Sequence, residues 1–305
     1  MMKDYLVGFL NIDKPKDWTS HDVVAKLRKI LGIKKIGHSG TLDPFATGVL
    51  VIGINSATRL FEYLESDKSY IAEIVFGIAT DTDDITGKVI ENSTQNPTLL
   101  EIKEALNNFN GKIKQKPPIY SAINLNGERA YKLARKNAIS LDDIKEKDVE
   151  IFSIEILNYS ENANNKPVLQ LKIHCSSGTY IRSIARDLGK ILNSCATLLS
   201  LARTRIGETF ILENSVTIEK VSISNLEDLV IKPIKAIKLN SIILGLEEEK
   251  DFTLGKQIVK KDIKLNPKEN KEVILLDNKK ELLGIGFIEN DFIIKPRKVI
   301  AKING

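Results

Sequence analysis

The sequence predicts an α+β protein built from two domains, a large mixed domain followed by a small β-barrel. The chain has 305 residues, whereas single domains usually contain about 100–200 residues. Apolar runs of strand length alternate with amphipathic helical segments over the first 240 residues or so. The acidic segment LEEEKDF then interrupts this pattern, and short strands separated by turns follow it. We therefore expect domains at residues 1–240 and 246–305.

Caps and turns mark the elements of the first domain. The run LVGFLNID predicts a buried strand that ends at the following Lys-Pro turn. Thr19 or Ser20 can cap a helix that continues to about Leu31, with Gly32 just past its end. VLVIGI and VLQLKIHC are typical of strands, and YIRSIARDLGKIL predicts a helix. Residues from about 122 to 150 are polar and lysine-rich, which predicts an inserted segment on the surface.

Composition and charge permit an RNA partner without requiring one. The formal net charge is +5, which equally fits a protein with a simple surplus of lysine. Two separated cysteines and three histidines lack the spacing of a metal site or a disulfide framework. No apolar run reaches the length of a membrane span, and the N-terminus does not resemble a signal peptide. We expect a cytoplasmic protein without metal or cofactor.

The segment GHSGTLDPFATGVL, residues 37–50, has the strongest chemical signature. Gly37, Gly40 and Gly48 frame a tight loop, and Pro44 restricts the backbone directly after Asp43. A carboxylate is thus presented on a stiff loop ahead of a buried strand, which suits catalysis. Asp-Pro is also a common turn dipeptide. The residues alone leave open whether Asp43 is catalytic or only forms a turn.

This segment resembles the catalytic motif of the bacterial tRNA pseudouridine-55 synthases, the TruB family. Four further segments resemble that family in the same order: NIDKPKDWTSHDVV, KSYIAEIVFGIATDTDDITG, QKPPIYSAINLNGERAYKLAR and CSSGTYIRSIARDLG. The resemblance implies a mixed, mainly antiparallel sheet of the pseudouridine synthase type, an inserted RNA-binding segment and a C-terminal PUA-like barrel. Two positions depart from the family: Asp17 stands where glycine is usual, and Ser177 stands where lysine is common.

The resemblance also implies a reaction, the isomerisation of uridine to pseudouridine at position 55 in the TΨC loop of tRNA. A monomer would act without cofactor or guide RNA. Asp43 would be the nucleophile or an electrostatic partner of the substrate. The nearby positive charge of Arg182 would keep its carboxylate ionised. Tyr70 would stack on the flipped base, although a strand aromatic in the core fits the pattern as well. His38 would fill the gap that the flipped base leaves in the RNA.

Other residues carried over from the family have ordinary structural alternatives. Tyr180 and Leu201 would form walls of the pocket, although packing in the core explains both almost as well. Arg182 begins a stripe at four-residue spacing with Arg186 and Lys190. Such a stripe equally fits a solvated basic face of a helix.

A basic cluster just before the loop supports an RNA partner independently of the resemblance. Its members are Lys26, Arg28, Lys29, Lys34 and Lys35, with no acidic residue between them. Phosphates would lie on such a patch, and we expect Lys34, Lys35 and also Lys14 to bind substrate. The alternative is a solvated helix face. Two rival functions remain: a synthase that depends on a guide RNA, and a non-enzymatic RNA-binding module.

Overall fold

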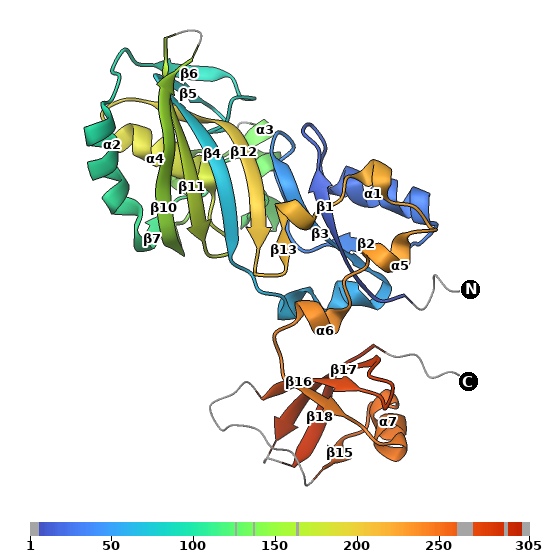
Figure 1. The fold of residues 1–305 in the computed structure, drawn as a ribbon. Helices are drawn as coiled ribbons and strands as arrows, with labels where there is room; N and C mark the ends of the chain where they lie inside the picture. The colour runs from blue at the N-terminus through green and yellow to red at the C-terminus, as the bar shows by residue number, and fades with distance from the viewer. Residues whose placement is uncertain are drawn as a thin grey trace.

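The structure is a computed structural model that describes residues 6–125, 127–136, 138–162, 165–260, 271–289 and 292–300. The predicted second domain, 246–305, and the predicted insertion each lie partly outside the described residues. A large sheet flanked by helices is joined through short helices to a smaller, curled sheet (Figure 1). The predicted α+β class is confirmed.

The large sheet is mixed and mainly antiparallel, as predicted. Its strands follow the order β1-β3-β12-β4-β11-β10-β7, with β2 beside β3 and β13 beside β12. They are β1 (Gly8–Lys14), β2 (Ile36–His38), β3 (Thr47–Ile54), β4 (Lys68–Phe76), β7 (Gly111–Gln115), β10 (Lys147–Glu161), β11 (Pro167–Cys175), β12 (Ala196–Ile206) and β13 (Phe210–Ile211). Within this sheet the pair β3 and β12 is parallel. This pairing places the segment that directly follows Asp43 beside a strand from far along the chain.

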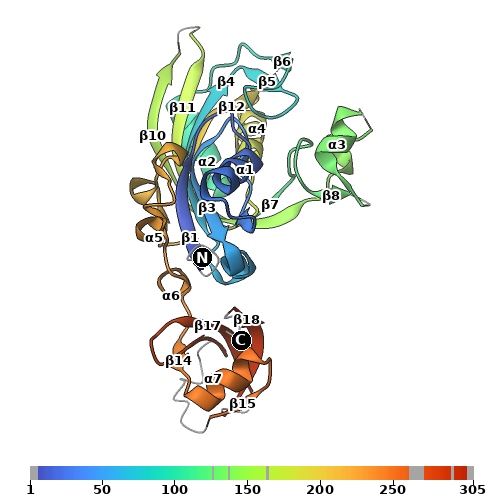
Figure 2. The ribbon, with the colours of Figure 1, turned by 90° about the vertical axis from the view of Figure 1, so that its right-hand side faces the viewer.

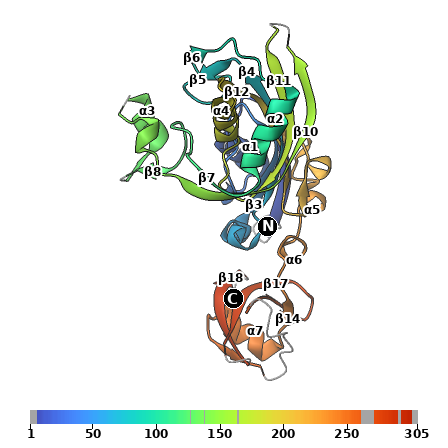
Figure 3. The ribbon, with the colours of Figure 1, turned by 90° about the vertical axis from the view of Figure 1, so that its left-hand side faces the viewer.

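Two helices of the first domain begin where the sequence predicts. Thr19 caps α1 (Ser20–Leu31) by accepting a hydrogen bond from the Asp22 amide, and Gly32 ends it with φ 66°. The second, α4 (Ile181–Ile191), shares one hydrophobic core with α2 (Leu99–Leu106), β4, β11 and β12. Figure 3 shows both on the same face of the sheet. The start of α4 is thereby fixed over the middle of the sheet.

Two excursions leave the large sheet. The first is the hairpin of β5 (Ile78–Thr80) and β6 (Val89–Asn92). The second lies between β7 and β10 and contains β8 (Asn124–Leu125), β9 (Glu128–Arg129) and α3 (Ala130–Arg135). Figure 2 shows α3 and β8 standing away from the sheet. The described residues of the predicted insertion thus form an outward arm, except that its last four, residues 147–150, belong to β10 of the large sheet.

The smaller sheet has the strand order β14-β16-β17-β18-β15. Its elements are β14 (Ser241–Ile243), α7 (Leu246–Thr253), β15 (Ile258–Val259), β16 (Glu272–Leu276), β17 (Leu282–Glu289) and β18 (Ile293–Val299), and α5 (Leu226–Leu229) and α6 (Pro233–Ala236) precede it. Ile274 and Ile285 share a hydrophobic cluster with Phe9 and Val49 of the large sheet. The two sheets are therefore joined by one hydrophobic cluster, which also includes Leu60 and Ile237 from the segments between them. No helix in the described part of the chain is long and apolar enough to span a membrane.

Candidate active site

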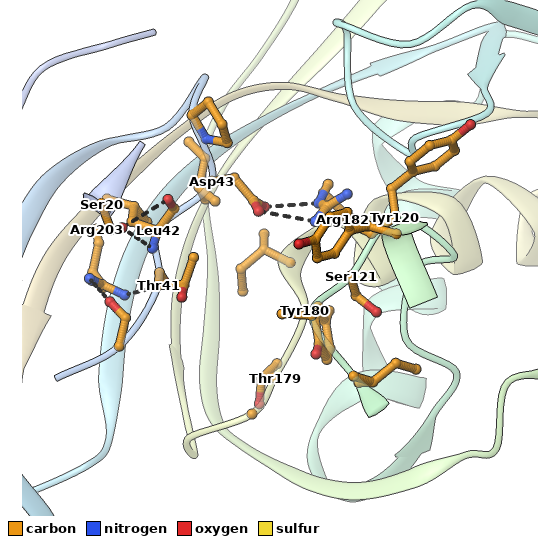
Figure 4. Close-up of a pocket in the computed structure, with 18 of the residues that line it drawn as sticks. Ser20, Thr41, Leu42, Asp43, Tyr120, Ser121, Thr179, Tyr180, Arg182 and Arg203 are labelled. Carbon is orange, nitrogen blue, oxygen red and sulfur yellow. Dashed lines mark hydrogen bonds and ion pairs between the residues drawn. The ribbon is translucent and has the colours of Figure 1, made fainter. Parts of the chain in front are cut away.

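A cavity of about 860 Å³ lies between the loop before β3, the ends of β4 and β12, the start of α4 and the base of the outward arm. Figure 4 shows the side chains that line it. Six residues singled out from the sequence line this cavity: His38, Asp43, Tyr70, Tyr180, Arg182 and Leu201. Segments that are far apart in the sequence are thus brought to one place.

The loop that carries Asp43 is held on both sides. The Ser20 hydroxyl accepts a hydrogen bond from the Leu42 amide (2.9 Å) and donates one to the Leu42 carbonyl (3.2 Å). Arg203, which is 1% exposed, donates from Nε to the Val49 carbonyl at 2.7 Å. The sequence analysis did not single out Arg203. A buried arginine needs acceptors, but its burial depends on the pairing of β12 with β3 and β4, which the sequence around Arg203 does not reveal.

Lys14 forms a hydrogen bond to the same loop, at the residue after Asp43. Its side chain is fully buried, and Nζ donates to the carbonyls of Pro15, Trp18 and Pro44 at 2.9, 2.6 and 3.1 Å. Burial lowers the pKa of Lys14 to about 8. The expectation that Lys14 binds substrate does not fit this burial, because the ammonium is enclosed by carbonyl oxygens of the protein. Lys14 instead ties the turn after β1 to the loop that carries Asp43.

The two positions that depart from the family pattern lie in the turn after β1 and at the edge of the cavity. Asp17 adopts φ 65°, the left-handed region that glycine adopts without strain. Its amide donates to the Pro44 carbonyl at 2.8 Å, so the aspartate preserves the turn that a glycine would form. Ser177 is exposed, next to Gly178 at the edge of the cavity.

Arg182 forms an ion pair with Asp43 in which two nitrogens of the guanidinium face the two carboxylate oxygens. Nε lies 2.9 Å from Oδ2 of Asp43, and Nη2 donates to Oδ1 at 3.1 Å (Figure 4). The guanidinium also donates to the carbonyls of Thr82 (3.0 Å) and Tyr120 (3.2 Å), and Asp84 lies 3.6 Å away. A bidentate pair fixes the direction of the carboxylate. The sequence analysis did not single out Thr82 or Asp84, which both contact the Arg182 guanidinium.

The interpretation of α4 as carrying a solvated basic face is wrong. Arg182 and Arg186 are 5% and 9% exposed, and only Lys190 of the predicted stripe is exposed. Arg186 pairs with Asp83 at 2.9 Å and with Asp187 at 2.8 Å. A buried guanidinium is costly unless it is paired with an opposite charge, and each of these two arginines contacts carboxylates. Spacing alone could not reveal this, because both carboxylates that contact Arg182 and one of the two that contact Arg186 come from distant segments.

Tyrosines and a leucine form the walls of the cavity. Tyr70 on β4 is 6% exposed, and burial raises its pKa to about 12 although Arg203 opposes the rise. Leu201 is 7% exposed. The amide group of Gln115, at the end of β7, bonds both the N–H (2.7 Å) and the C=O (3.0 Å) of Tyr180. The sequence analysis missed Gln115, because its partner lies across the fold. Tyr70 and Leu201 are both core residues and cavity walls.

His38 ends β2 at the rim of the cavity and is half-buried. Burial and then the charge of Arg203 lower the pKa of His38, so its ring is neutral near pH 7. Lys34 and Lys35 are exposed, before the other end of β2 and outside the cavity lining. Arg28 of the same basic cluster donates to the Ile36 carbonyl at 2.6 Å. In this basic cluster, Arg28 thus stabilises the fold, whereas the side chains of Lys34 and Lys35 face the solvent.

Gly48 allows β3 and β12 to approach closely. Its φ is 99°, and a Cβ at this position would lie 2.3 Å from the Arg203 carbonyl oxygen. A side chain would clash there with backbone atoms. The glycine near the end of the motif therefore meets a packing requirement.

Comparison with known proteins identifies the family. Residues 28–181 match the family model described as TruB family pseudouridylate synthase (N terminal domain). A tRNA pseudouridine synthase B from Microcystis aeruginosa is 44% identical over 301 residues, which cover 97% of this chain and 100% of the relative. This chain belongs to the TruB family. A second relative of the same name, from Trichormus variabilis, is 50% identical over 212 residues, or 69% of this chain and 71% of the relative. As a member of the TruB family, the protein is an isomerase of the pseudouridine synthase class.

Solved structures share the fold of this TruB-family chain. An archaeal box H/ACA sRNP Nop10–Cbf5 complex contains a chain with a TM-score of 0.69 at 24% identity, covering 99% of this chain and 88% of that one. An H/ACA RNP bound to a substrate RNA containing 2′-deoxyuridine gives a TM-score of 0.68 at 22% identity, with coverage of 99% and 87%. The likeness extends over both sheets. At these identities it concerns the fold alone.

Proposed function

We propose that the protein converts uridine to pseudouridine at position 55 in the TΨC loop of tRNA. The observation that carries the proposal is the carboxylate of Asp43, held by its ion pair and hydrogen bond with Arg182 inside a cavity lined by tyrosines. The cavity volume of about 860 Å³ is within the range of small-molecule sites, so it can hold a flipped nucleotide. The choice of tRNA is supported by the name of relatives that match nearly the whole chain.

The reaction is an isomerisation that needs no redox partner. The C1′–N1 bond breaks, the uracil turns, a C1′–C5 bond forms, and the proton lost from C5 is balanced by one gained at N1. Asp43 acts as the nucleophile, and the bidentate guanidinium directs it toward the bound nucleotide. The Tyr70 hydroxyl, whose pKa is raised to about 12, stays protonated at neutral pH. It can therefore donate a hydrogen bond to the substrate, and its ring can stack on the base.

The target base must leave its stack in the RNA to reach Asp43. Unstacking costs a few kcal/mol, and a flat group that fills the gap reduces that cost. His38 lies at the rim of the cavity with a neutral ring, and we assign it this role. Tyr180 and Leu201 enclose the flipped base from the other sides.

The RNA extends from the cavity over a wider surface. The exposed Lys34 and Lys35 contact phosphates, and the arm within residues 122–150 holds the RNA beside the cavity. Residues 1–240 form the catalytic domain, and residues 246–305 form a PUA-like RNA-binding domain. The protein acts as a monomer in the cytoplasm, on tRNA alone.

The test is incubation of the protein with an unmodified tRNA transcript, followed by mapping of pseudouridine at single-nucleotide resolution. We expect one product, in the TΨC loop, without added RNA or cofactor. Product that forms only with an added guide RNA would favour the guide-dependent reading. Tight binding without product would favour an RNA-binding module.

A further inference from the structure

Arg186 is a buried cation to which the proposed chemistry assigns no role. It lies one helical turn after Arg182 on α4 and does not line the cavity. Its Nη1 is 2.9 Å from Oδ2 of Asp83, and its Nη2 donates to the Lys116 carbonyl at 2.8 Å. Its Nε is 2.8 Å from Oδ1 of the neighbouring Asp187. All three nitrogens of the guanidinium are thus used within the protein.

The two arginines of α4 bridge the same two segments of the chain. Arg182 donates to the carbonyls of Thr82 (3.0 Å) and Tyr120 (3.2 Å). Figure 4 shows its guanidinium between Asp43 and Tyr120. Arg186 contacts the residue that follows Thr82 and the residue four places before Tyr120. The outer arginine therefore holds the two segments whose carbonyls hold the inner one.

The segment before Tyr120 can be held only weakly by its own amides. Residues 117 and 118 are both proline, which has no N–H and a fixed φ. The Lys116 carbonyl accepts from two donors on α4, Arg186 and the Ser183 hydroxyl, both at 2.8 Å. Because the two prolines stiffen the link, a shift of Lys116 is passed on to the Tyr120 carbonyl.

The contact with Asp83 is electrostatic. The Asp83 side chain is 15% exposed. Burial raises its pKa, and the charge of Arg186 opposes this rise. Arg186 therefore keeps the carboxylate ionised and paired. Its chain neighbours Thr82 and Asp84 both contact Arg182, so the place of Asp83 also sets the place of these contacts.

We propose that Arg186 is a positioning residue for pseudouridine formation: it fixes the two segments that orient Arg182, which in turn orients the Asp43 carboxylate. This inference rests on the proposed function. A displacement of about 1 Å at a reacting group can cost about 10²-fold in rate. Arg186 lies outside the cavity lining, so its loss should slow the reaction without weakening the binding of tRNA.

Removal of both charges separates positioning from stability. Arg186→Met alone leaves Asp83 buried without this cation, and the melting temperature should fall by roughly 6–12 °C. Addition of Asp83→Asn removes the unpaired charge, so the double variant should regain at least about half of this loss. Its single-turnover rate on tRNA should nevertheless stay roughly 10–100-fold below wild type, with a dissociation constant within about 3-fold. The double variant carries the test even where Arg186→Met does not fold.

Ser183→Ala is the matched control on the same helix. Ser183 is fully buried and outside the cavity lining, and its loss removes the other hydrogen bond to the Lys116 carbonyl while both charges stay. Its rate should remain within about 3-fold of wild type. Arg186→Lys, which keeps a positive charge beside Asp83, should react faster than the double variant.

A double variant that reacts at the rate of wild type would show that Arg186 only stabilises the fold, and would overturn the inference. Equal losses of rate and of tRNA affinity, or an equal loss of rate in Ser183→Ala, would also overturn it. Absence of product with the wild type would instead refute the proposed function itself.

Discussion

Replacing Asp43 by asparagine removes one negative charge while the shape of the side chain is kept. The Arg182 guanidinium is not left alone by this change, because the carbonyls of Thr82 and Tyr120 and the carboxylate of Asp84 remain within 3.6 Å. The Asp43 side chain is 33% exposed, and solvent therefore weakens the ion pair. The loss of stability should be about 1 kcal/mol, which lowers the melting temperature by about 2–4 °C.

The effect on the reaction should be far larger. If Asp43 is the nucleophile, pseudouridine formation should fall by at least about 10³-fold, or about 4 kcal/mol in the activation barrier. The dissociation constant for tRNA should change by less than about 3-fold, because phosphate contacts dominate affinity. Release of tritium from C5 of uridine in tRNA measures turnover under single-turnover conditions. Filter binding at the same salt concentration measures affinity.

Asp67→Asn is the matched control for Asp43→Asn. The Asp67 side chain is 28% exposed and pairs with Arg205 at 3.3 Å, outside the cavity lining. This variant should lose a similar amount of stability and keep its turnover. Turnover of Asp43→Asn within about 10-fold of wild type, or equal inactivation of both variants, would refute the role assigned to Asp43.

Three further predictions address the surroundings of this carboxylate. The pKa of Tyr70 is raised to about 12, so its contribution to stability is complete below the unfolded value of about 10 and is lost as the pH rises through 12. In the wild type the free energy of unfolding, measured by urea unfolding from pH 9 to 12, should fall by up to about 3 kcal/mol because of this tyrosine. This part of the fall should be absent in Tyr70→Phe. Changing Lys34 and Lys35 together to alanine should lower the slope of log affinity for tRNA against log salt by up to about 2, and an unchanged slope would return them to a purely solvated role. Gln115→Leu, which removes both bonds to the Tyr180 backbone, should lower kcat more than tRNA affinity, and equal effects on both would argue against a role in positioning.

Local features of the fold were predictable because their causes are local. The helix from Ser20 to Leu31 was predicted from its cap and its terminal glycine, and both act within one turn of chain. The strands β3, with its continuous apolar run, and β11, in which apolar and polar residues alternate, were identified for the same reason. The pairing of β3 with β12 could not be read from either strand, since it depends on how the whole sheet is assembled.

The candidate site was predictable only where residues belong to a compact motif. Asp43 and Arg182 were singled out separately, and the structure joins them. Their supports were missed, because Asp84 and Gln115 acquire their roles from partners far away in the sequence. Lys14 was misjudged as a substrate ligand, since a lysine in a turn is usually solvated and only the fold reveals its burial.

The close approach at Gly48 restricts transfer of the Asp43 segment to another protein. The segment packs against β12 at a distance that leaves no room for a Cβ at this glycine. If the fourteen-residue segment were transferred alone to a new scaffold, Asp43 would lack Arg182, which orients its carboxylate, and Arg203 of β12, which holds its loop. The smallest portable unit is therefore a pair of neighbouring parallel strands with the loop between β2 and β3, together with the first turn of α4 that supplies Arg182.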